Sequence, residues 1–320
     1  MQPIDLTIII PHYNVPDLLE KLIKSIPDSR EIQVIVVDDN SDKQKEKLVR
    51  VEALYKERVE FYINSTGIKS AGSCRNIGLE HAKGKWILFA DADDYFLPNM
   101  YDVVKSYFET NYDIIFFTPT SVVVETGEVS NRHLKCERVI RNYLRIPSEV
   151  NAIALKAVQT EQPWSKLIRR ELIEKYNVRF SQSLHWNDIL FSTIIGYHSK
   201  EIYASEEKIY CITKSKGTLT TYMDECSYDI RLEEYIKHCK FLLEHYDSSL
   251  CRKLHVTGAG KLYMAFQQHY GLKKYIEVII KFKKNHIPIF NVNTLNPLYL
   301  YVRIKKSKLK KKQDERYYIK

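Results

Sequence analysis

Apolar runs and helically spaced segments alternate along the chain up to Thr118. Continuous, largely β-branched runs at residues 6–11 and 34–37 predict strands that are buried on both faces. Further strands are predicted at residues 59–63, 86–90 and 113–118. The segments between them carry apolar residues at helical spacing, over residues 16–26, from about 41 to 56, around 74–79 and over 98–110. We expect Ser41 and Asp42 to cap the second of these helices. This alternation predicts an open, mostly parallel α/β sheet flanked by helices.

The pattern changes after Ser121. A hairpin is expected around Gly127, and it is followed by a polar, arginine-bearing stretch to about Pro147 without regular alternation. Short elements return later, and from Ser227 onward the apolar spacing is helical. We therefore expect one α/β unit over residues 1–220, a helical C-terminal region over 221–302 and a basic tail over 303–320.

The net charge of +9 is concentrated at the C-terminus. Residues 303–320 hold nine basic and two acidic side chains, a local +7, which leaves +2 for the other 302 residues. This distribution disfavours a nucleic-acid-binding surface spread over the whole chain. The lysines between Lys305 and Lys312 favour attraction to an anionic membrane surface. A solvated tail and contact with RNA are the alternatives.

Cysteine spacing and apolar content bear on the cellular compartment. The six cysteines form no CxxC pair, which disfavours zinc and redox motifs and favours reduced thiols packed in the core. The apolar run from Leu6 to Ile10 is too short for a signal peptide, and no stretch reaches the roughly 20 apolar residues of a membrane-spanning helix. We therefore expect a cytoplasmic protein that binds peripherally to the inner face of the plasma membrane through its basic tail.

Two acidic clusters follow predicted strands. Asp38 and Asp39 come after the second strand, and Asp91, Asp93 and Asp94 come after the fourth. Ligands of open α/β sheets bind outside the carboxyl ends of the strands, so both clusters are expected to face one crevice. In extended backbone Asp91 and Asp93 would point the same way, and Mg²⁺ or Mn²⁺ held with a diphosphate would relieve their repulsion. The alternative is a turn that caps the next helix.

Several motifs in a fixed order carry a resemblance to a known family. They are Ile10–Asn14, Val36–Asp42, Arg75–Leu79, Asp91–Asp94, Pro163–Arg170 and Trp186–Phe191. In this order they resemble the family 2 glycosyltransferases of the A-type fold, in the branch that builds bacterial capsules and other surface polysaccharides. The resemblance spans roughly Thr7 to Leu219 and implies a Rossmann-like sheet, with a nucleotide-binding half over about 1–120 and an acceptor half over about 121–220.

The resemblance also implies an activity and a donor site. The chain would be an inverting, metal-dependent hexosyltransferase that moves a sugar from a uridine diphosphate (UDP) sugar to a saccharide or lipid-linked saccharide. Manganese or magnesium would be the cofactor. The residues implied are Asp39 and Arg75 against the uracil, Pro11 and Tyr13 lining the base pocket, Asp91 at the ribose, Asp93 as metal ligand and Asp94 in support.

Asp188 is the expected catalytic base. Inversion requires a group that takes the acceptor proton while the hydroxyl attacks in line with the departing diphosphate, and the resemblance implies Asp188 for this role. Trp186 and the apolar run after Asp188 would desolvate the carboxylate and raise its pKa. Asn187 stands where the family commonly has Glu. Alternatively, Asn187 or Asp188 only caps the following helix, and His185 is a less favoured base.

Lys214 and Lys216 are expected to close over the diphosphate. With Gly217 they resemble a flexible segment of the family that covers the donor. A solvated turn would have the same composition.

Other classes of protein fit the sequence less well. A sugar-nucleotide nucleotidylyltransferase would share the sheet and the acidic site, but it would carry a glycine-rich phosphate loop after the first strand, where Pro11–Asn14 stands. A dehydrogenase lacks support for the same reason. A non-catalytic, membrane-associated scaffold with this fold remains the third alternative.

Overall fold

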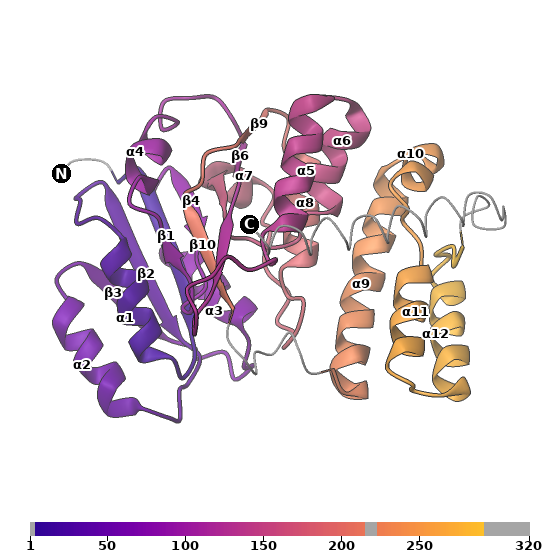
Figure 1. The fold of residues 1–320 in the computed structure, drawn as a ribbon, viewed down its shortest axis with the longest axis horizontal. Helices are drawn as coiled ribbons and strands as arrows, with labels where there is room; N and C mark the ends of the chain where they lie inside the picture. Colours follow the sequence, from indigo (N-terminus) through magenta and orange to yellow (C-terminus); the bar gives the residue numbers. More distant parts are fainter. Residues whose placement is uncertain (1–3, 215–222, 291–320) are drawn as a thin grey trace.

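A seven-stranded sheet forms the centre of the α/β part of the molecule (Figure 1). The computed structural model describes residues 4–214 and 223–290. The strand order is β3-β2-β1-β4-β8-β6-β9, in which β8 runs antiparallel to both neighbours and the other pairs are parallel. The strands are β1 Leu6–His12, β2 Ile32–Asp38, β3 Val59–Ile63, β4 Trp86–Phe89, β6 Ile114–Phe117, β8 Lys166–Arg169 and β9 Ile202–Ser205. The predicted mostly parallel α/β sheet and its five strands are confirmed.

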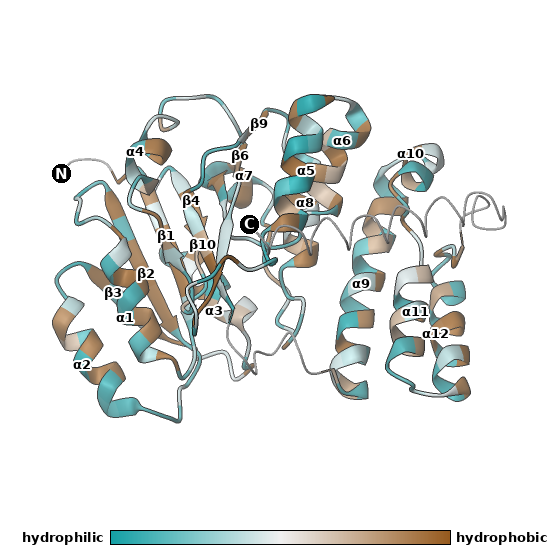
Figure 2. Cartoon of the chain, viewed as in Figure 1, coloured by the Kyte–Doolittle hydropathy of each residue, from teal (hydrophilic) through white to brown (hydrophobic). Residues whose placement is uncertain are grey.

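Helices cover both faces of this sheet, which explains why its central strands β1, β2 and β4 are buried along their whole length. Neighbouring residues of β1 enter different cores: Ile8 and Ile10 pack in one, and Ile9 packs in the other. The first core also receives apolar residues from α1 Pro16–Ser25, α2 Lys45–Tyr55 and α4 Met100–Lys105. The second receives them from α3 Ala71–His81, α5 Leu134–Arg145, α7 Arg170–Lys175 and α8 Ile189–His198. Figure 2 shows the resulting hydrophobic colouring along β1 and β2.

Two helix predictions need correction. The second helix does not begin at Ser41 or Asp42 but at Lys45, and neither side chain caps it, because both are engaged with the loop after β1. The helix expected over 98–110 is shorter: α4 ends at Lys105, and turns follow it. After α4 the hydroxyls of Ser106 and Thr110 donate to backbone carbonyls three residues earlier.

The arginine-bearing stretch after the hairpin is helical, contrary to the prediction. Its helix α5 buries Cys136, Val139 and Ile140, a spacing of three and four residues that places them on one face. The arginines occupy the other positions and mask this narrow apolar stripe in the sequence. A short helix α6 Glu149–Ile153 and a π-helical turn η1 Ala154–Val158 continue the segment.

A small second sheet connects the acidic turn after β4 with later parts of the chain. It consists of β5 Tyr95–Phe96, β10 Tyr210–Lys214 and β7 Thr120–Val123, with β10 in the centre. The predicted hairpin is present after β7, where Val123 N–H donates to the Glu128 carbonyl at 2.8 Å and Gly127 adopts a φ of 70°. Strand β10 therefore lies directly beside the segment that follows the fourth strand of the main sheet.

The C-terminal region is helical, as predicted. It comprises α9 Glu225–His245, α10 Ser248–Lys253, α11 Ala259–Gln267 and α12 Leu272–Lys284. These helices share one hydrophobic core, to which Ile153, Ala154 and Ala157 of the α/β part also contribute. Figure 1 shows α9 between the α/β part and the pair α11 and α12. The basic tail over 303–320 lies outside the described residues.

Two further expectations concern the cysteines and membrane-spanning helices. All six cysteines are free thiols and five are buried, which confirms the predicted core role for all except the exposed Cys226. Among the helices that the structure describes, none combines the length and the apolar content that a bilayer crossing requires.

Candidate active site

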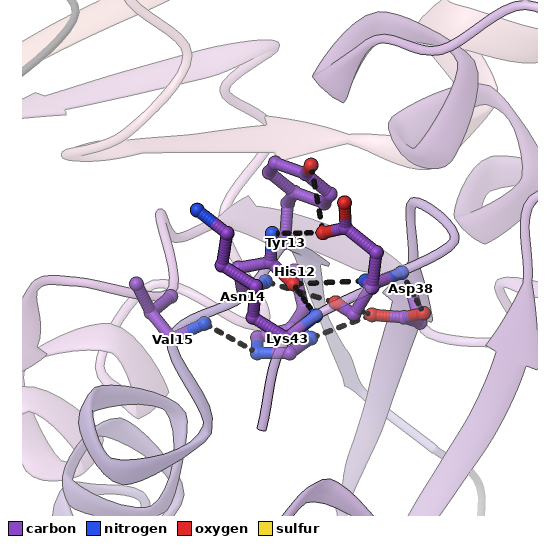
Figure 3. Close-up of polar contacts among 8 residues, drawn as sticks. His12, Tyr13, Asn14, Val15, Asp38 and Lys43 are labelled. Carbon is purple, nitrogen blue, oxygen red and sulfur yellow. Dashed lines mark hydrogen bonds and ion pairs between the residues drawn. The ribbon is translucent and has the colours of Figure 1, made fainter. Parts of the chain in front are cut away.

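The loops after β1 and β2 are held together by a buried histidine–aspartate pair (Figure 3). His12 Nδ1 lies 2.7 Å from Asp38 Oδ1, and Val15 N–H donates to His12 Nε2 at 3.2 Å, so the proton on Nδ1 faces the carboxylate. Ser41 adds two hydrogen bonds to Asp38, from its amide and its hydroxyl. Burial alone would raise the pKa of Asp38, but the hydrogen bonds from His12 and Ser41 lower it. Asp38 is thus a structural anchor.

Tyr13 is exposed at the carboxyl end of β1, whereas Pro11 is buried within the strand. The hydroxyl of Tyr13 donates to Asp42 at 3.1 Å, and Lys69 Nζ lies 3.6 Å from the centre of its ring. Asn14, in a left-handed conformation with φ of 58°, also binds Asp42 and orients this loop. Of the two residues that the resemblance places at the base, Tyr13 presents its ring to solvent.

Asp39 is buried beside α3. Its carboxylate accepts a hydrogen bond of 2.6 Å from the amide of Asn64, and its backbone N–H donates to the His12 carbonyl at 2.8 Å. Burial and the neighbouring Asp39 raise the pKa of the Cys74 thiol on α3, which keeps that thiol neutral. Asp39 therefore stands between the loop after β2 and the first turn of α3.

Arg75 joins Asp91 to the segment that carries Asp188. One guanidinium nitrogen lies 2.7 Å from Asp91 Oδ1 and another donates to Asn187 Oδ1 at 2.8 Å. Its side chain is only 6% exposed, so it is not the surface helix residue of the alternative interpretation. The contact also needs close packing, because a Cβ on Gly72 would lie 2.1 Å from the Ser181 carbonyl.

The acidic segment Asp91–Asp94 forms a turn and not the extended backbone that we expected. Asp94 N–H donates to the Asp91 carbonyl at 3.0 Å, which closes the turn. Burial and the neighbouring Asp91 raise the pKa of Asp93 to about 6. The helix α4 takes Asn99 at its N-cap position, so the acidic residues do not cap it.

Asp94 ties this turn to β10. Its two oxygens accept hydrogen bonds from the Tyr210 hydroxyl at 2.8 Å and from the Thr213 N–H at 2.7 Å. The same Tyr210 hydroxyl accepts a bond from the Asp91 N–H at 2.9 Å. Asp94 is buried, and its network fixes the backbone from which Asp91 and Asp93 project.

Replacing Asp94 with alanine should lower the free energy of unfolding by about 2 kcal/mol, because a buried hydroxyl and a buried N–H lose their acceptor. Urea denaturation followed by circular dichroism measures the change. The matched variant Asp94→Asn keeps one acceptor oxygen and should lose less. Equal stability of Asp94→Ala and the unmodified protein would contradict the structural role.

The pair Asp91 and Asp93 suits a divalent ion that takes most of its ligands from a bound diphosphate. Hard cations such as Mg²⁺ are often held by one or two carboxylates together with phosphate oxygens and water. Burial and the negative charge of Asp91 raise the pKa of Asp93, and a cation held between the two carboxylates would oppose both effects. Within residues 4–214 and 223–290, no three acidic, histidine or cysteine side chains group as a metal site.

Asp188 opens onto a cavity of about 520 Å³ that Asp91 also lines. It occupies the N-cap position of α8, but its side chain makes no capping hydrogen bond, contrary to the capping alternative. Burial raises the pKa of Asp188 to about 6, against the opposing effect of Arg75. The direction is the one predicted from its apolar neighbours. His185 lies apart from this cavity lining and contacts the Ser227 hydroxyl at 3.1 Å.

Most of the cavity wall was not singled out in the sequence. The other lining residues come from five separate segments and are Arg132, Lys135, Glu161, Gln162, Trp164, Trp186, Ile189, Tyr235 and Lys261. Of these, only Trp164, Trp186 and Ile189 stood within recognised motifs. Tyr235 and Lys261 belong to α9 and α11, and their helical spacing carries no signal that they reach a site.

The two lysines expected over the diphosphate are placed only in part. Lys214 is the last residue of β10 and is exposed. Lys216 and the rest of its segment lie outside the described residues. Arg132 approaches the same strand end, since its guanidinium donates to the Thr213 carbonyl at 2.8 Å.

Proteins with related sequences bear glycosyltransferase names. The chain is 25% identical over 209 residues to the uncharacterized glycosyltransferase YibD of Escherichia coli, covering 64% of this chain and 60% of that protein. It is 41% identical over 146 residues to an uncharacterized glycosyltransferase of Haemophilus influenzae, covering 40% and 47%. It is 24% identical over 240 residues to the GalNAc(5)-diNAcBac-PP-undecaprenol β-1,3-glucosyltransferase of Campylobacter jejuni, covering 74% of each chain. The match thus spans less than two thirds of the first two relatives.

Solved structures of glycosyltransferases share the fold. Staphylococcus aureus TarS 1–349 in complex with UDP-GlcNAc aligns over 94% of this chain and 88% of its own, with a TM-score of 0.67 at 19% identity. The mannosyltransferase PcManGT from Pyrobaculum calidifontis, in complex with GDP-Man and Mn²⁺, aligns over 94% and 83%, with a TM-score of 0.55 at 15% identity. The expected A-type glycosyltransferase fold is confirmed.

Residues 7–176 match the sequence pattern of the family described as "Glycosyl transferase family 2". This range is more than half of the chain and holds the strands β1 to β4 with the loops that carry Asp39, Arg75 and Asp91. On this match, the chain belongs to glycosyl transferase family 2.

Proposed function

We propose that this protein transfers a sugar from a UDP-sugar to a saccharide acceptor hydroxyl, with inversion, in the synthesis of a bacterial surface polysaccharide. The observation that carries the proposal is the link between two carboxylates in one cavity. Asp91 and Asp188 both line it. Arg75 binds Asp91 and also Asn187, which directly precedes Asp188 in the chain. A donor carboxylate and a base held by one arginine suit a two-substrate transfer.

The donor side is proposed at the carboxyl ends of β1, β2 and β4, where ligands of open α/β sheets bind. Asp39 and Arg75 would contact the uracil beside Tyr13 and Pro11, and Asp91 would contact the ribose. The exposed ring of Tyr13 and the burial of Asp39 and Arg75 support these roles. Lys214 and Lys216 would cover the diphosphate. The UDP-GlcNAc complex of TarS, which shares the fold, supports a UDP-sugar.

Metal dependence is proposed through Asp93, with Asp91 beside it. Mn²⁺ or Mg²⁺ bound there would neutralise the departing diphosphate. The Mn²⁺ complex of PcManGT is consistent with this role. The residues of the chain supply the geometry: Asp94, Tyr210 and Thr213 hold the turn from which the metal ligand projects.

Asp188 is proposed to accept the proton of the acceptor hydroxyl. A base works best when its pKa lies near the working pH, and burial moves the pKa of this carboxyl to about 6. Asn187 holds the segment, since its side chain binds Arg75 at one end and the Ser183 carbonyl at the other. The asparagine thus provides a neutral hydrogen-bonding partner where the family commonly has Glu.

The pH dependence of transfer should show this ionisation. Below pH 6 Asp188 becomes protonated, so kcat/KM for the acceptor should fall about tenfold per pH unit. Protonation of Asp93 would steepen the fall at limiting metal, because its pKa also lies at about 6. At saturating Mn²⁺ the slope should return to one proton, since a bound cation keeps Asp93 ionised. A rate independent of pH between 4.5 and 7 would argue against a carboxylate base.

Release of UDP tests the proposed reaction. The full chain is incubated with a panel of UDP-sugars, with GDP-mannose as a comparison, in Mn²⁺ and in chelator. We expect UDP release from at least one UDP-sugar that chelator suppresses, with water taking the sugar in slow hydrolysis when no saccharide acceptor is added. Mass spectrometry of the products then identifies the donor sugar. A nucleotidylyltransferase would release no UDP, and only with added pyrophosphate would it convert a UDP-sugar to UTP and sugar 1-phosphate. A scaffold would release nothing above the chelated control.

The acceptor is proposed to be a saccharide, lipid-linked in the cell, at the inner face of the plasma membrane. The printed name of the Campylobacter relative includes an undecaprenol-linked saccharide, which supports this acceptor class. The net charge of +7 over residues 303–320 supports docking on anionic lipid. Capsule and exopolysaccharide synthesis are the processes that such a reaction would serve.

A further inference from the structure

A lysine from the C-terminal helices reaches the cavity that holds Asp188. Lys261 belongs to α11, and its ammonium lies 3.6 Å from the centre of the Trp186 ring and 4.5 Å from the centre of the Tyr235 ring. All three side chains line the cavity. Tyr235 is fixed by its hydroxyl, which donates to the Thr257 carbonyl at 2.9 Å. Two aromatic rings and one cation thus meet where the C-terminal helices border the cavity.

The other cations near this cavity have direct polar partners. Lys135 pairs with Glu161 at 2.7 Å, Arg75 pairs with Asp91, and Arg132 donates to the Thr213 carbonyl. Within the described part of the chain, Lys261 Nζ makes no hydrogen bond and lies within 4.0 Å of no carboxylate; its contacts are the two rings. An ammonium so placed favours an anionic ligand, because ring faces compensate a buried charge only partly.

Electrostatics at Lys261 agree with this geometry. Burial lowers the pKa of Lys261 to about 7, and Lys135 and Arg231 act in the same direction, while Glu161 opposes them. The lowered pKa means that the charged ammonium is poorly compensated in the protein alone. A bound carboxylate or phosphate would supply the missing negative charge.

The backbone at Trp186 is specialised in the same place. Trp186 has a φ of 55°, a left-handed conformation that is unfavourable for a bulky side chain. Trp186 lies two residues before Asp188, and the residue between them, Asn187, accepts a hydrogen bond from Arg75. The conformation directs the indole into the cavity, and aromatic faces at such sites are suited to stacking on sugar rings.

We propose that this end of the cavity is a subsite for an anionic saccharide, whose carboxylate or phosphate pairs with Lys261 Nζ while its sugar ring packs on Trp186. The proposal rests on the proposed function, in which the acceptor hydroxyl lies at Asp188. The acceptor would then carry a negative charge on, or next to, the sugar that is extended. The helices α9 and α11 would complete the acceptor site with Tyr235 and Lys261.

Binding of small probes tests the subsite without turnover. The full chain is titrated with methyl β-glucuronide, glucose 6-phosphate and neutral methyl β-glucoside, and binding is followed by tryptophan fluorescence, since Trp164 and Trp186 line the cavity. At least one anionic probe should bind about tenfold more tightly than the neutral glucoside, the effect of one partly buried charged hydrogen bond. The tighter of the two anions distinguishes a carboxylate from a phosphate.

The variants separate charge from packing. Lys261→Met keeps the aliphatic chain against the rings and should abolish the preference for anions, whereas Lys261→Arg should retain it. Lys253→Met is the matched control, because Lys253 is exposed at the end of α10, and it should leave the preference unchanged. Equal binding of neutral and anionic probes to the unmodified protein, or an equal loss of both in Lys261→Met, would overturn the subsite.

Failure of the subsite and failure of the proposed function are distinguishable. UDP release with no anion preference would overturn the subsite and leave the transferase intact. An anion preference that depends on Lys261, without release of UDP from any donor, would support the subsite and contradict the transferase.

Discussion

Replacement of Asp188 with asparagine is expected to lower the rate of sugar transfer about 10³-fold, within the range that general-base catalysis contributes. Asparagine has the shape of aspartate but cannot accept the acceptor proton. Donor binding should remain close to normal, because the proposal places Asp188 at the acceptor and gives the nucleotide to other residues, and Arg75 keeps its bonds to Asp91 and Asn187. Steady-state kinetics give the rate, and calorimetry with UDP gives the donor affinity.

Loss of activity in Asp188→Asn should not come from unfolding. Burial raises the pKa of Asp188, so its ionised form is costly in the folded protein at neutral pH and a neutral amide removes that cost. The carboxylate of Glu161 lines the same cavity and provides the matched variant. Glu161→Gln should retain transfer within about tenfold, since it removes a charge without removing the base. A large loss of donor affinity in Asp188→Asn would contradict the assignment.

Replacement of Asp93 with asparagine should weaken donor binding in Mn²⁺ by about 2 kcal/mol, or about 30-fold. The amide is a poorer ligand for a hard cation than a carboxylate. Without the negative charge of Asp93, the site would hold less tightly the cation that neutralises the diphosphate. The bond between the Thr213 hydroxyl and the Asp93 backbone carbonyl is unaffected by this change, so the turn should persist. Titration calorimetry with UDP, with and without Mn²⁺, measures the effect.

Chelation supplies the internal comparison for Asp93. In chelator the unmodified protein and Asp93→Asn should bind UDP with the same affinity, because the difference between them depends on the ion. Asp102→Asn is the matched surface control, since Asp102 is exposed on α4, and it should behave as the unmodified protein. Unchanged affinity of Asp93→Asn in Mn²⁺ would show that Asp93 does not ligate the metal.

Parts of the candidate site could be anticipated from local patterns. Apolar runs buried on both faces predict parallel strands, and polar residues directly after such strands lie at one edge of the sheet. This reasoning placed Asp39 and Asp91 at one edge of the sheet, where Asp91 lines the cavity of Asp188 and Asp39 is not among the lining residues. It also predicted that apolar neighbours raise the pKa of Asp188. The prediction of extended backbone at Asp91–Asp94 was wrong. The Tyr210 hydroxyl binds both the Asp91 N–H and the Asp94 carboxylate, and this holds the segment in a turn.

The alternation of buried strands and helices could be read from the sequence, because it follows from interactions between near neighbours in the chain. The same holds for the acidic residues at the strand ends. The tertiary structure decided which distant residues meet. Arg75 reaches Asn187 across 112 positions, and Lys261 enters the cavity of Asp188 from α11. Such contacts depend on the packing of whole helices, for which spacing along the chain gives only the buried face and not the partner.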